Sequence, residues 1–267
     1  MTDPSALALD APGARTAGDR WFFPALAVLI SGTGFAGFSF TYFGPILGGT
    51  YPPAGAPLHL HGWSFFLWYL LFPLQAVLIG TGRGALHRAL GRSSVVLVAV
   101  MALTGLLVLS VRVEEALRTG GPEVWLQYGP HILSNLVLFV AFYAAALRMA
   151  LTARFAAHMR LMVVASAIGL GAGFARLILY LSGFHPLWLP MGTLGCSLFI
   201  GLGIVYDALT RRHVHSAYWI GLAALLVVEG SMLPQVNPDG VAWVNEGLGR
   251  LGEFLGVVYQ PEPTVEF

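Results

Sequence analysis

The chain has 267 residues, of which 57% are hydrophobic and only 10% are charged. A soluble globular domain is usually about 25% charged, so too little polar surface remains to cover a water-soluble protein of this size. The net charge of +1 argues against binding to nucleic acid, which needs a basic surface. All 14 basic residues are arginine, which excludes a retinal Schiff base and any other lysine nucleophile. The single cysteine, Cys196, excludes disulfides and thiolate metal clusters.

Seven apolar segments have lengths near the roughly 20 residues that a helix needs to cross the lipid bilayer, and glycine and proline clusters separate them. The sequence therefore predicts an all-α polytopic membrane protein of about seven transmembrane helices. The expected helices cover residues 21–47, 60–82, 93–113, 130–152, 158–182, 187–209 and 216–236. Residues 1–20 are expected to form a disordered cytoplasmic tail, residues 21–236 the transmembrane domain, and residues 237–267 an extracytoplasmic tail.

Arginine is distributed unequally between the two expected membrane faces. Cytoplasmic loops of membrane proteins carry an excess of basic residues, so this asymmetry predicts that the amino terminus lies in the cytoplasm and the carboxyl terminus outside. The arginines on the expected inner side are Arg15, Arg20, Arg83, Arg88, Arg92, Arg154, Arg160, Arg211 and Arg212.

The expected outer tail has a helical pattern of its own. Apolar residues recur there at steps of three and four, which is one face of a helix. This segment is too short and too polar to span the membrane, so it is expected to lie on the outer surface or to dock through residues 241–258 on another subunit of a membrane complex. Its apolar positions are Val241, Val244, Leu248, Leu251, Leu255 and Val258.

The second to fifth expected helices have the pattern of a duplication. His61 and His131 begin the second and fourth helices and lie 70 positions apart. His87 and His158 follow the ends of these helices and lie 71 positions apart. Two helical hairpins in tandem would form a pseudo-symmetric four-helix bundle. The closely spaced Gly169, Gly171 and Gly173 are expected to permit close helix packing.

Histidines gather at the expected outer face, where they could hold a cofactor. Neutral imidazole is the commonest metal ligand and the usual axial ligand of haem b. Two arrangements are open. His61 and His131 could be the two axial ligands of one haem b, or His59, His61 and His131 could bind copper or another metal ion.

Two charged residues lie within expected membrane helices near the same face. A charge at that depth costs several kcal/mol unless it is paired, so such residues are functional candidates. Arg176 and Glu229 lie at matched depths, which suggests a mutual ion pair. Alternatively, Glu229 could be a ligand or proton relay, and Arg176 could pair with a haem propionate or a substrate anion. Asn135, one turn below His131, could share this pocket.

The expected inner face has a second group of histidines, beside arginines. His87 and His158 could ligate a second cofactor, or the inner histidines, with His213 and His215, could contact phosphate headgroups. Asp207 could orient one of these histidines or pair with Arg211 one turn further on.

Three stretches carry a resemblance to known proteins. They read LHLHGWSFFLWYLLFPLQ followed by ALHRALG, then AHMRLM, then VYDALTRRHVHSAYWIG. Together they resemble a group of small polytopic bacterial membrane proteins of unknown function over roughly residues 20–235. This resemblance implies the helical bundle and a role for His61, His87, His131, His158 and His215.

A looser likeness concerns His61-Gly62, the aromatic residues after it, and Pro73. This segment is similar to the second helix of haem–copper oxidase catalytic subunits, where such a histidine binds low-spin haem, and to the NnrS-type haem and copper membrane proteins. The chain is too short for either complete fold.

These features favour a membrane redox protein that binds haem b or a metal such as copper near the outer face and exchanges electrons with quinol. An accessory subunit or assembly factor of a larger respiratory or other membrane complex is the first alternative, with the histidines structural. A transporter with Arg176 and Glu229 along its path is the second alternative, although the sequence shows no discontinuous helix pair of the kind that transporters use.

Overall fold

A computed structural model describes residues 18–256 of the chain, and within this range it is all-α, without strands. Five helices are long and apolar enough to cross a membrane, and a sixth span results if the bent pair α7–α8 is counted as one. The prediction of an all-α polytopic membrane protein is confirmed at this level.

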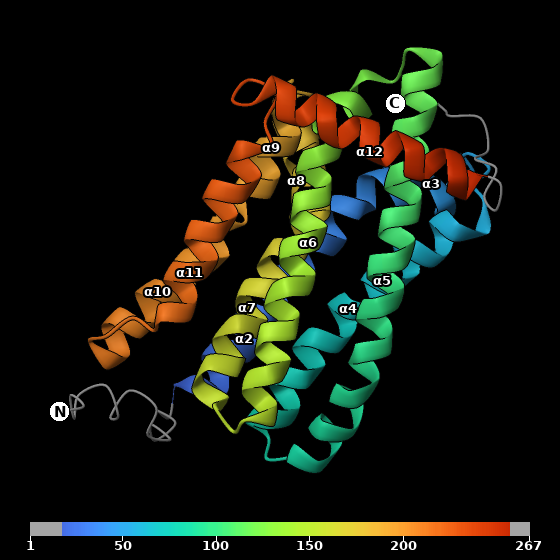
Figure 1. The fold of residues 1–267 in the computed structure, drawn as a ribbon. Coiled ribbons are helices and arrows are strands. Elements are labelled where there is room, and N and C mark those ends of the chain that lie inside the picture. Colours follow the sequence, from blue (N-terminus) through green and yellow to red (C-terminus); the bar gives the residue numbers. More distant parts are fainter. Residues whose placement is uncertain (1–17, 257–267) are drawn as a thin grey trace.

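The helices differ in length and several contain breaks (Figure 1). Two segments, labelled η, are π-helical turns. In chain order the elements are α2 (Asp19–Phe38), η1 (Ser39–Phe43), α3 (Gly44–Leu47), α4 (Ala56–Gly80), α5 (Gly84–Thr119), α6 (Glu123–Leu151), α7 (Phe155–Gly169), α8 (Gly171–Leu181), α9 (Trp188–Gly195), α10 (Ser197–Arg211), α11 (Ser216–Ala224), η2 (Leu225–Glu229) and α12 (Pro238–Gly256).

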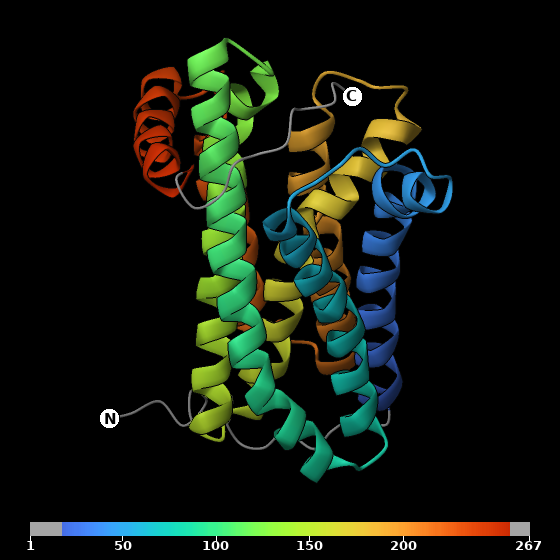
Figure 2. The ribbon, with the colours of Figure 1, turned by 90° about the vertical axis from the view of Figure 1, so that its right-hand side faces the viewer.

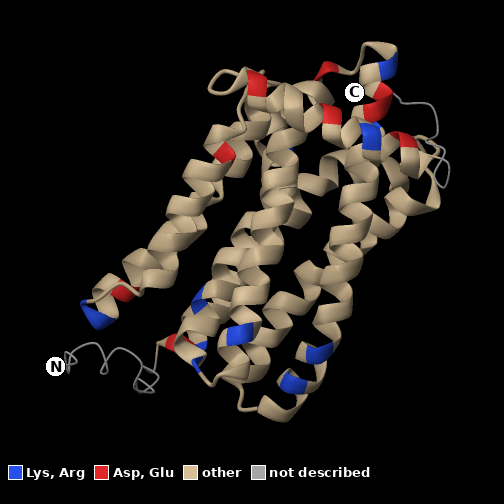
Figure 3. Ribbon diagram, viewed as in Figure 1, with Lys and Arg blue, Asp and Glu red and all other residues tan. Residues whose placement is uncertain are grey.

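The long helices run alongside one another, and charge divides their two ends (Figures 2 and 3). Arginines predominate at one end, which includes the α4–α5 and α6–α7 turns and is called the arginine end below. Acidic residues predominate at the other end, where α12 lies across the bundle, and this is called the α12 end. The asymmetry seen in the sequence is thus an asymmetry of the folded bundle.

Three predicted helices have a different form in the structure. The helix expected at 158–182 bends by 47° between α7 and α8, so the chain does contain a discontinuous helix that the sequence did not reveal. The helix expected at 187–209 is interrupted at Cys196, between α9 and α10. The helix expected at 216–236 covers only Ser216–Glu229, because the residues that follow turn toward Pro238.

Glycines explain how α8 approaches α2 so closely. A Cβ atom on Gly37 would lie 1.8 Å from the Gly173 carbonyl oxygen, and one on Gly173 would lie 2.9 Å from the Gly34 Cα. Only glycine fits at such a crossing, because the two backbones are in contact. The predicted role of Gly173 in close packing is confirmed.

The predicted amphipathic helix forms α12 and packs on its own chain. Val241 and Leu248 are buried, and Leu248 packs with Leu109 and Val113 of α5. Asn245 also donates a hydrogen bond to the Leu126 carbonyl oxygen of α6 at 2.6 Å. The bundle therefore covers much of the apolar face that could have docked on another subunit, and residues 257 and 258 of the proposed docking segment lie outside the described residues.

Two turns of the bundle have matching geometry. Thr81 and Thr152 follow α4 and α6, and each hydroxyl donates to the carbonyl oxygen four residues earlier at 2.9 Å. The next residues, Gly82 and Ala153, both have positive φ, of 77° and 59°. At the other end of these helices, the hydroxyl groups of Ser64 and Ser134 donate to the carbonyl oxygens of the two histidines 70 positions apart.

A buried charge network at the arginine end joins α2, α7 and α10. Arg160, which is only 3% exposed, donates two hydrogen bonds of 2.7 Å to Asp207, which is fully buried. Arg211 bonds to Asp207 at 3.1 Å and to both oxygens of Asp19 at 2.6 Å. The predicted Asp207–Arg211 pair is confirmed. Residues 1–17 of the predicted disordered tail lie outside the described residues, but Asp19 belongs to α2 and anchors it.

Substitution of Asp207 by Asn tests how much this network contributes to stability. It leaves Arg160 buried without its counter-charge, and removal of one partner from a buried ion pair costs about 3 to 5 kcal/mol. We expect a loss of this size in the free energy of unfolding, measured by denaturation of the detergent-solubilised protein. Asp239→Asn, at an exposed position of α12, is the matched control and should change stability by less than about 0.5 kcal/mol. Equal stability of the two variants would contradict the account.

Candidate functional site

The structure distributes the predicted site residues over separate places in the bundle. His59 bonds through Nδ1 to the Tyr42 hydroxyl at 3.1 Å, and His61 lies 3.4 Å from the Thr104 hydroxyl. His131 and Glu229 meet inside the bundle toward the α12 end.

His131 is buried completely and both of its ring nitrogens have protein partners. Nδ1 lies 3.0 Å from the backbone carbonyl oxygen of Glu229, and because a carbonyl only accepts, Nδ1 carries a hydrogen. Nε2 makes a close contact with the Thr193 hydroxyl and lies 3.5 Å from Glu229 Oε2. His131 is eight residues into α6, so the ring is attached about 12 Å below the helix start.

Asn135 connects Glu229 to the break between α7 and α8. Its side-chain nitrogen donates to Glu229 Oε1 at 2.8 Å and to the Ile168 carbonyl oxygen at 3.0 Å. The adjacent Gly169 carbonyl oxygen accepts from the Tyr69 hydroxyl at 3.3 Å. A helix break frees backbone carbonyls that lipid cannot satisfy, so these two side chains stabilise the bend. A Cβ on Gly171 would lie 2.7 Å from the Asn135 nitrogen, which explains the glycine there.

Glu229 is fully buried and ends the π-helical turn η2. Single π turns occur often at functional sites. Here the turn brings both the side chain and the backbone carbonyl of Glu229 to His131. Its Oε2 atom has no hydrogen-bond partner within the described part of the chain. The group of His131, Asn135, Thr193 and Glu229 is called the buried acid cluster below.

The suggested ion pair between Arg176 and Glu229 does not form. The Arg176 guanidinium donates instead to the Ala172 carbonyl oxygen at 2.9 Å and lies 4.6 Å from the centroid of the Phe38 ring. The bend before α8 changes the direction of Arg176, so equal depth in the sequence does not bring the two charges together. Arg176 is therefore stabilised by a backbone carbonyl and an aromatic face.

The structure also does not assemble the predicted metal site of His59, His61 and His131. Within residues 18–256, no three His, Cys, Asp or Glu side chains are grouped as a bound metal ion would require. Since both nitrogens of His131 contact protein groups, this ring offers no nitrogen to a haem shared with His61. The sequence places residues at one depth but does not say which way each side chain points.

His87 and His158 lie together at the arginine end. Their ring centroids are 6.4 Å apart and their planes are inclined by 80°. His87 Nδ1 lies 3.3 Å from the Gln75 carbonyl oxygen, and His158 Nδ1 lies 2.9 Å from the Ala146 carbonyl oxygen. Each histidine thus bonds to the carbonyl 12 residues earlier, in equivalent positions of the two hairpins. The pair lies where the two halves of the repeat meet.

These hydrogen bonds fix the tautomer of both rings. Because each Nδ1 donates to a carbonyl, the lone pair of the neutral ring is on Nε2. A metal-bound histidine almost always donates its other nitrogen in this way, which orients the ring and raises its basicity. The His87 carbonyl is held in turn by the Gln75 side-chain nitrogen at 3.2 Å. The His87–His158 pair therefore has the arrangement of two oriented ligands.

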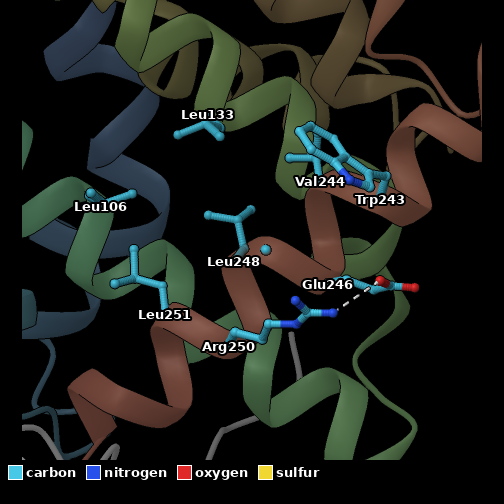
Figure 4. Close-up of a pocket in the computed structure, with 9 residues that line it drawn as sticks. Leu106, Leu133, Trp243, Val244, Glu246, Leu248, Arg250 and Leu251 are labelled. Carbon is cyan, nitrogen blue, oxygen red and sulfur yellow. Dashed lines mark ion pairs between the residues drawn. The ribbon is translucent and has the colours of Figure 1, made fainter.

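A shallow pocket at the α12 end is a weaker candidate. Leu106, Leu133, Val244, Leu248 and Leu251 line it together with Trp243, and the Glu246–Arg250 ion pair of 3.8 Å lies at its edge (Figure 4). Both charged side chains are largely exposed. This lining suits an acyl chain and contains no group for catalysis or for metal binding.

Comparison of the chain with known protein families, characterised proteins and solved structures finds no match. The class of protein rests on the fold and composition themselves: a polytopic helical membrane protein with polar side chains grouped inside its bundle.

Several residues of these groups were not found from the sequence. Thr193 is a lone hydroxyl in an apolar segment, and nothing in the sequence distinguishes it. Asp19 and Arg160 were assigned to a tail and to a basic loop, although both are buried. His215, which the resemblance singled out, caps α11 by accepting the Ala217 N–H at 3.1 Å. Asn135 could be suspected, because it lies one turn from His131.

Substitution of Asn135 by Leu tests whether the buried acid cluster supports the helix break. It removes the donors to Glu229 and Ile168, and an unsatisfied buried acceptor costs about 1 to 3 kcal/mol. We expect the free energy of unfolding to fall by about that amount. Gln127→Leu, at an exposed position of the same helix, is the control. A loss in Asn135→Leu no larger than in the control would show that these hydrogen bonds do not hold the bend.

Proposed function

We propose that the protein is a membrane electron-transfer protein that binds one haem b at the arginine end, with His87 and His158 as axial ligands. The observation that carries the proposal is the symmetric pair of rings 6.4 Å apart, each oriented by a hydrogen bond from Nδ1 to a backbone carbonyl. If two imidazoles held one metal ion between them, each ligating nitrogen would lie about 2 Å from the ion and the two nitrogens about 4 Å apart. The two ring centroids would then lie farther apart than the nitrogens, as the centroids of His87 and His158 do.

Haem fits this pair better than a bare metal ion does. Haem provides the four equatorial nitrogens itself and requires only two axial ligands from the protein. A bare zinc or copper site requires three or four protein ligands, and the described residues offer no such group. Histidines on facing helices are also the usual way in which helical bundles hold cofactors.

The surroundings of the pair suit the rest of the haem. Arg83 and Arg154 precede α5 and α7, one turn before the two histidines, and both are exposed at the arginine end. Guanidinium groups pair with carboxylates, so these arginines are available to haem propionates near the membrane surface. This location replaces the outer-face site expected from the sequence.

The proposal includes the finer topology expected from the sequence. In this arrangement Ser216–Glu229 and the turn after it form a seventh crossing, and the arginine end faces the bacterial cytoplasm, in agreement with the positive-inside rule. Electrons would come from quinol or from another protein of the membrane, since a haem between the helices is within reach of both.

The test is the haem content and spectrum of the purified protein, expressed with an adequate supply of haem. We expect about one haem b per chain by the pyridine haemochrome assay, with the optical spectrum of six-coordinate low-spin iron. His87→Ala and His158→Ala should each lose the low-spin spectrum and at least about tenfold in haem affinity, because loss of even an outer-shell partner typically costs about 10- to 100-fold.

His213→Ala is the matched control, because His213 is an exposed histidine at the same end. It should keep both haem content and spectrum. A folded protein without haem would refute the proposal, as would a low-spin spectrum that survives in both His87→Ala and His158→Ala.

A further inference from the structure

The buried acid cluster contains the one carboxyl group of the described chain that is both fully buried and without a basic residue bonded to it. Glu229 is 0% exposed, and its Oε1 accepts from the neutral Asn135 amide. The other fully buried carboxylate, Asp207, has two arginines. A charge in the membrane interior is costly without a partner, so the charge of Glu229 must be balanced within its own cluster.

The hydrogen bonds of the cluster allow one exchangeable proton. His131 Nδ1 always carries a hydrogen, because it faces a carbonyl. The Thr193 hydroxyl lies 3.1 Å from the Leu189 carbonyl oxygen and 3.4 Å from the Pro190 carbonyl oxygen, and it makes a close contact with His131 Nε2. It can therefore accept from a protonated ring or donate to a neutral one. The cluster is uncharged overall either with neutral His131 and protonated Glu229, or with an imidazolium and a carboxylate.

The geometry favours the form with neutral His131 and protonated Glu229. The 3.5 Å separation of His131 Nε2 and Glu229 Oε2 is too long for a strong ionic hydrogen bond. Two buried charges are stable only if their geometry and their other hydrogen bonds are good, and Oε2 has no hydrogen-bond partner among the described residues. Glu229 therefore holds the proton, with the lone pair of His131 beside it.

No other charged group faces Glu229 from the elements packed around it. The elements with the most extensive contacts to η2 are α6, α9 and α11. α6 provides His131 and Asn135, α9 provides Thr193, and α11 has no charged side chain. The thiol of Cys196, directly after α9, is the remaining titratable group nearby. The proton balance thus depends on His131 and Glu229.

We propose that Glu229 and His131 form a proton-binding site inside the membrane, which exchanges its proton with water at the α12 end. The position of Glu229 sets the direction of exchange. The helix continues only through Ser231 before the turn that leads to Pro238, whereas the arginine end lies the full length of α11 away. The bend at α7–α8 is the element that a change of protonation would affect, because Asn135 bonds to both Glu229 and Ile168.

An apolar carbodiimide tests this directly in the full-length protein in lipid nanodiscs. The reagent reacts with a protonated carboxyl group: the acid O–H adds across one C=N bond, and the O-acylisourea rearranges to a stable N-acylurea without a leaving group. Mass spectrometry of the peptide with Glu229 then measures labelling at each pH. We expect labelling of wild-type Glu229 that falls about tenfold per pH unit once the proton is released.

Three variants make the result specific. Glu229→Gln should lose the label at this peptide, and Glu123→Gln, exposed at the start of the same α6, should not change it. In His131→Gln the carboxyl group has no imidazole to take its proton, so labelling should persist to a proton concentration about tenfold lower. An unlabelled Glu229 in the folded wild-type protein, labelling that does not depend on pH, or an unchanged pH profile in His131→Gln would each overturn the inference. Haem content plays no part in this readout.

Discussion

A polar or charged side chain inside this bundle must find its partner within the chain, because lipid offers none. This constraint explains most of the internal architecture. Asp207 holds two arginines and joins α2, α7 and α10. Asn135 and Tyr69 satisfy the carbonyls that the α7–α8 bend releases. His131 bonds to the backbone carbonyl of Glu229, and Asn135 bonds to its side chain. These interior polar residues thus hold helices together.

The two proposed sites follow from the same constraint in different ways. His87 and His158 are half-buried near the bundle end, and their Nδ1 hydrogens go to backbone carbonyls, which orients both rings. His131 is fully buried, and the protein itself supplies partners for both of its nitrogens. His87 and His158 thus lie together at the arginine end, whereas the histidines toward the α12 end have separate surroundings.

Much of the fold could be predicted from the sequence, since apolar length and helix breaks depend on local composition. The arginine asymmetry, the α12 helix and the 70-residue repeat were also readable, because each is a pattern along the chain. The bend at Leu170 was not, although Gly169 and Gly171 flank it, because the partners that stabilise it come from α4 and α6. The same limit applies to the candidate site: depth placed Arg176 beside Glu229, but side-chain direction separates them.

The position of iron in an experimental structure of the haem-loaded protein tests the central claim most directly. Anomalous scattering at the iron edge identifies the metal independently of the model of the protein. The account predicts a single iron between the His87 and His158 rings, bonded to Nε2 of each, with His131 still in contact with Glu229 and Thr193. Iron located beside His61 or His131, or a well-ordered haem whose axial ligands are not this pair, would contradict it.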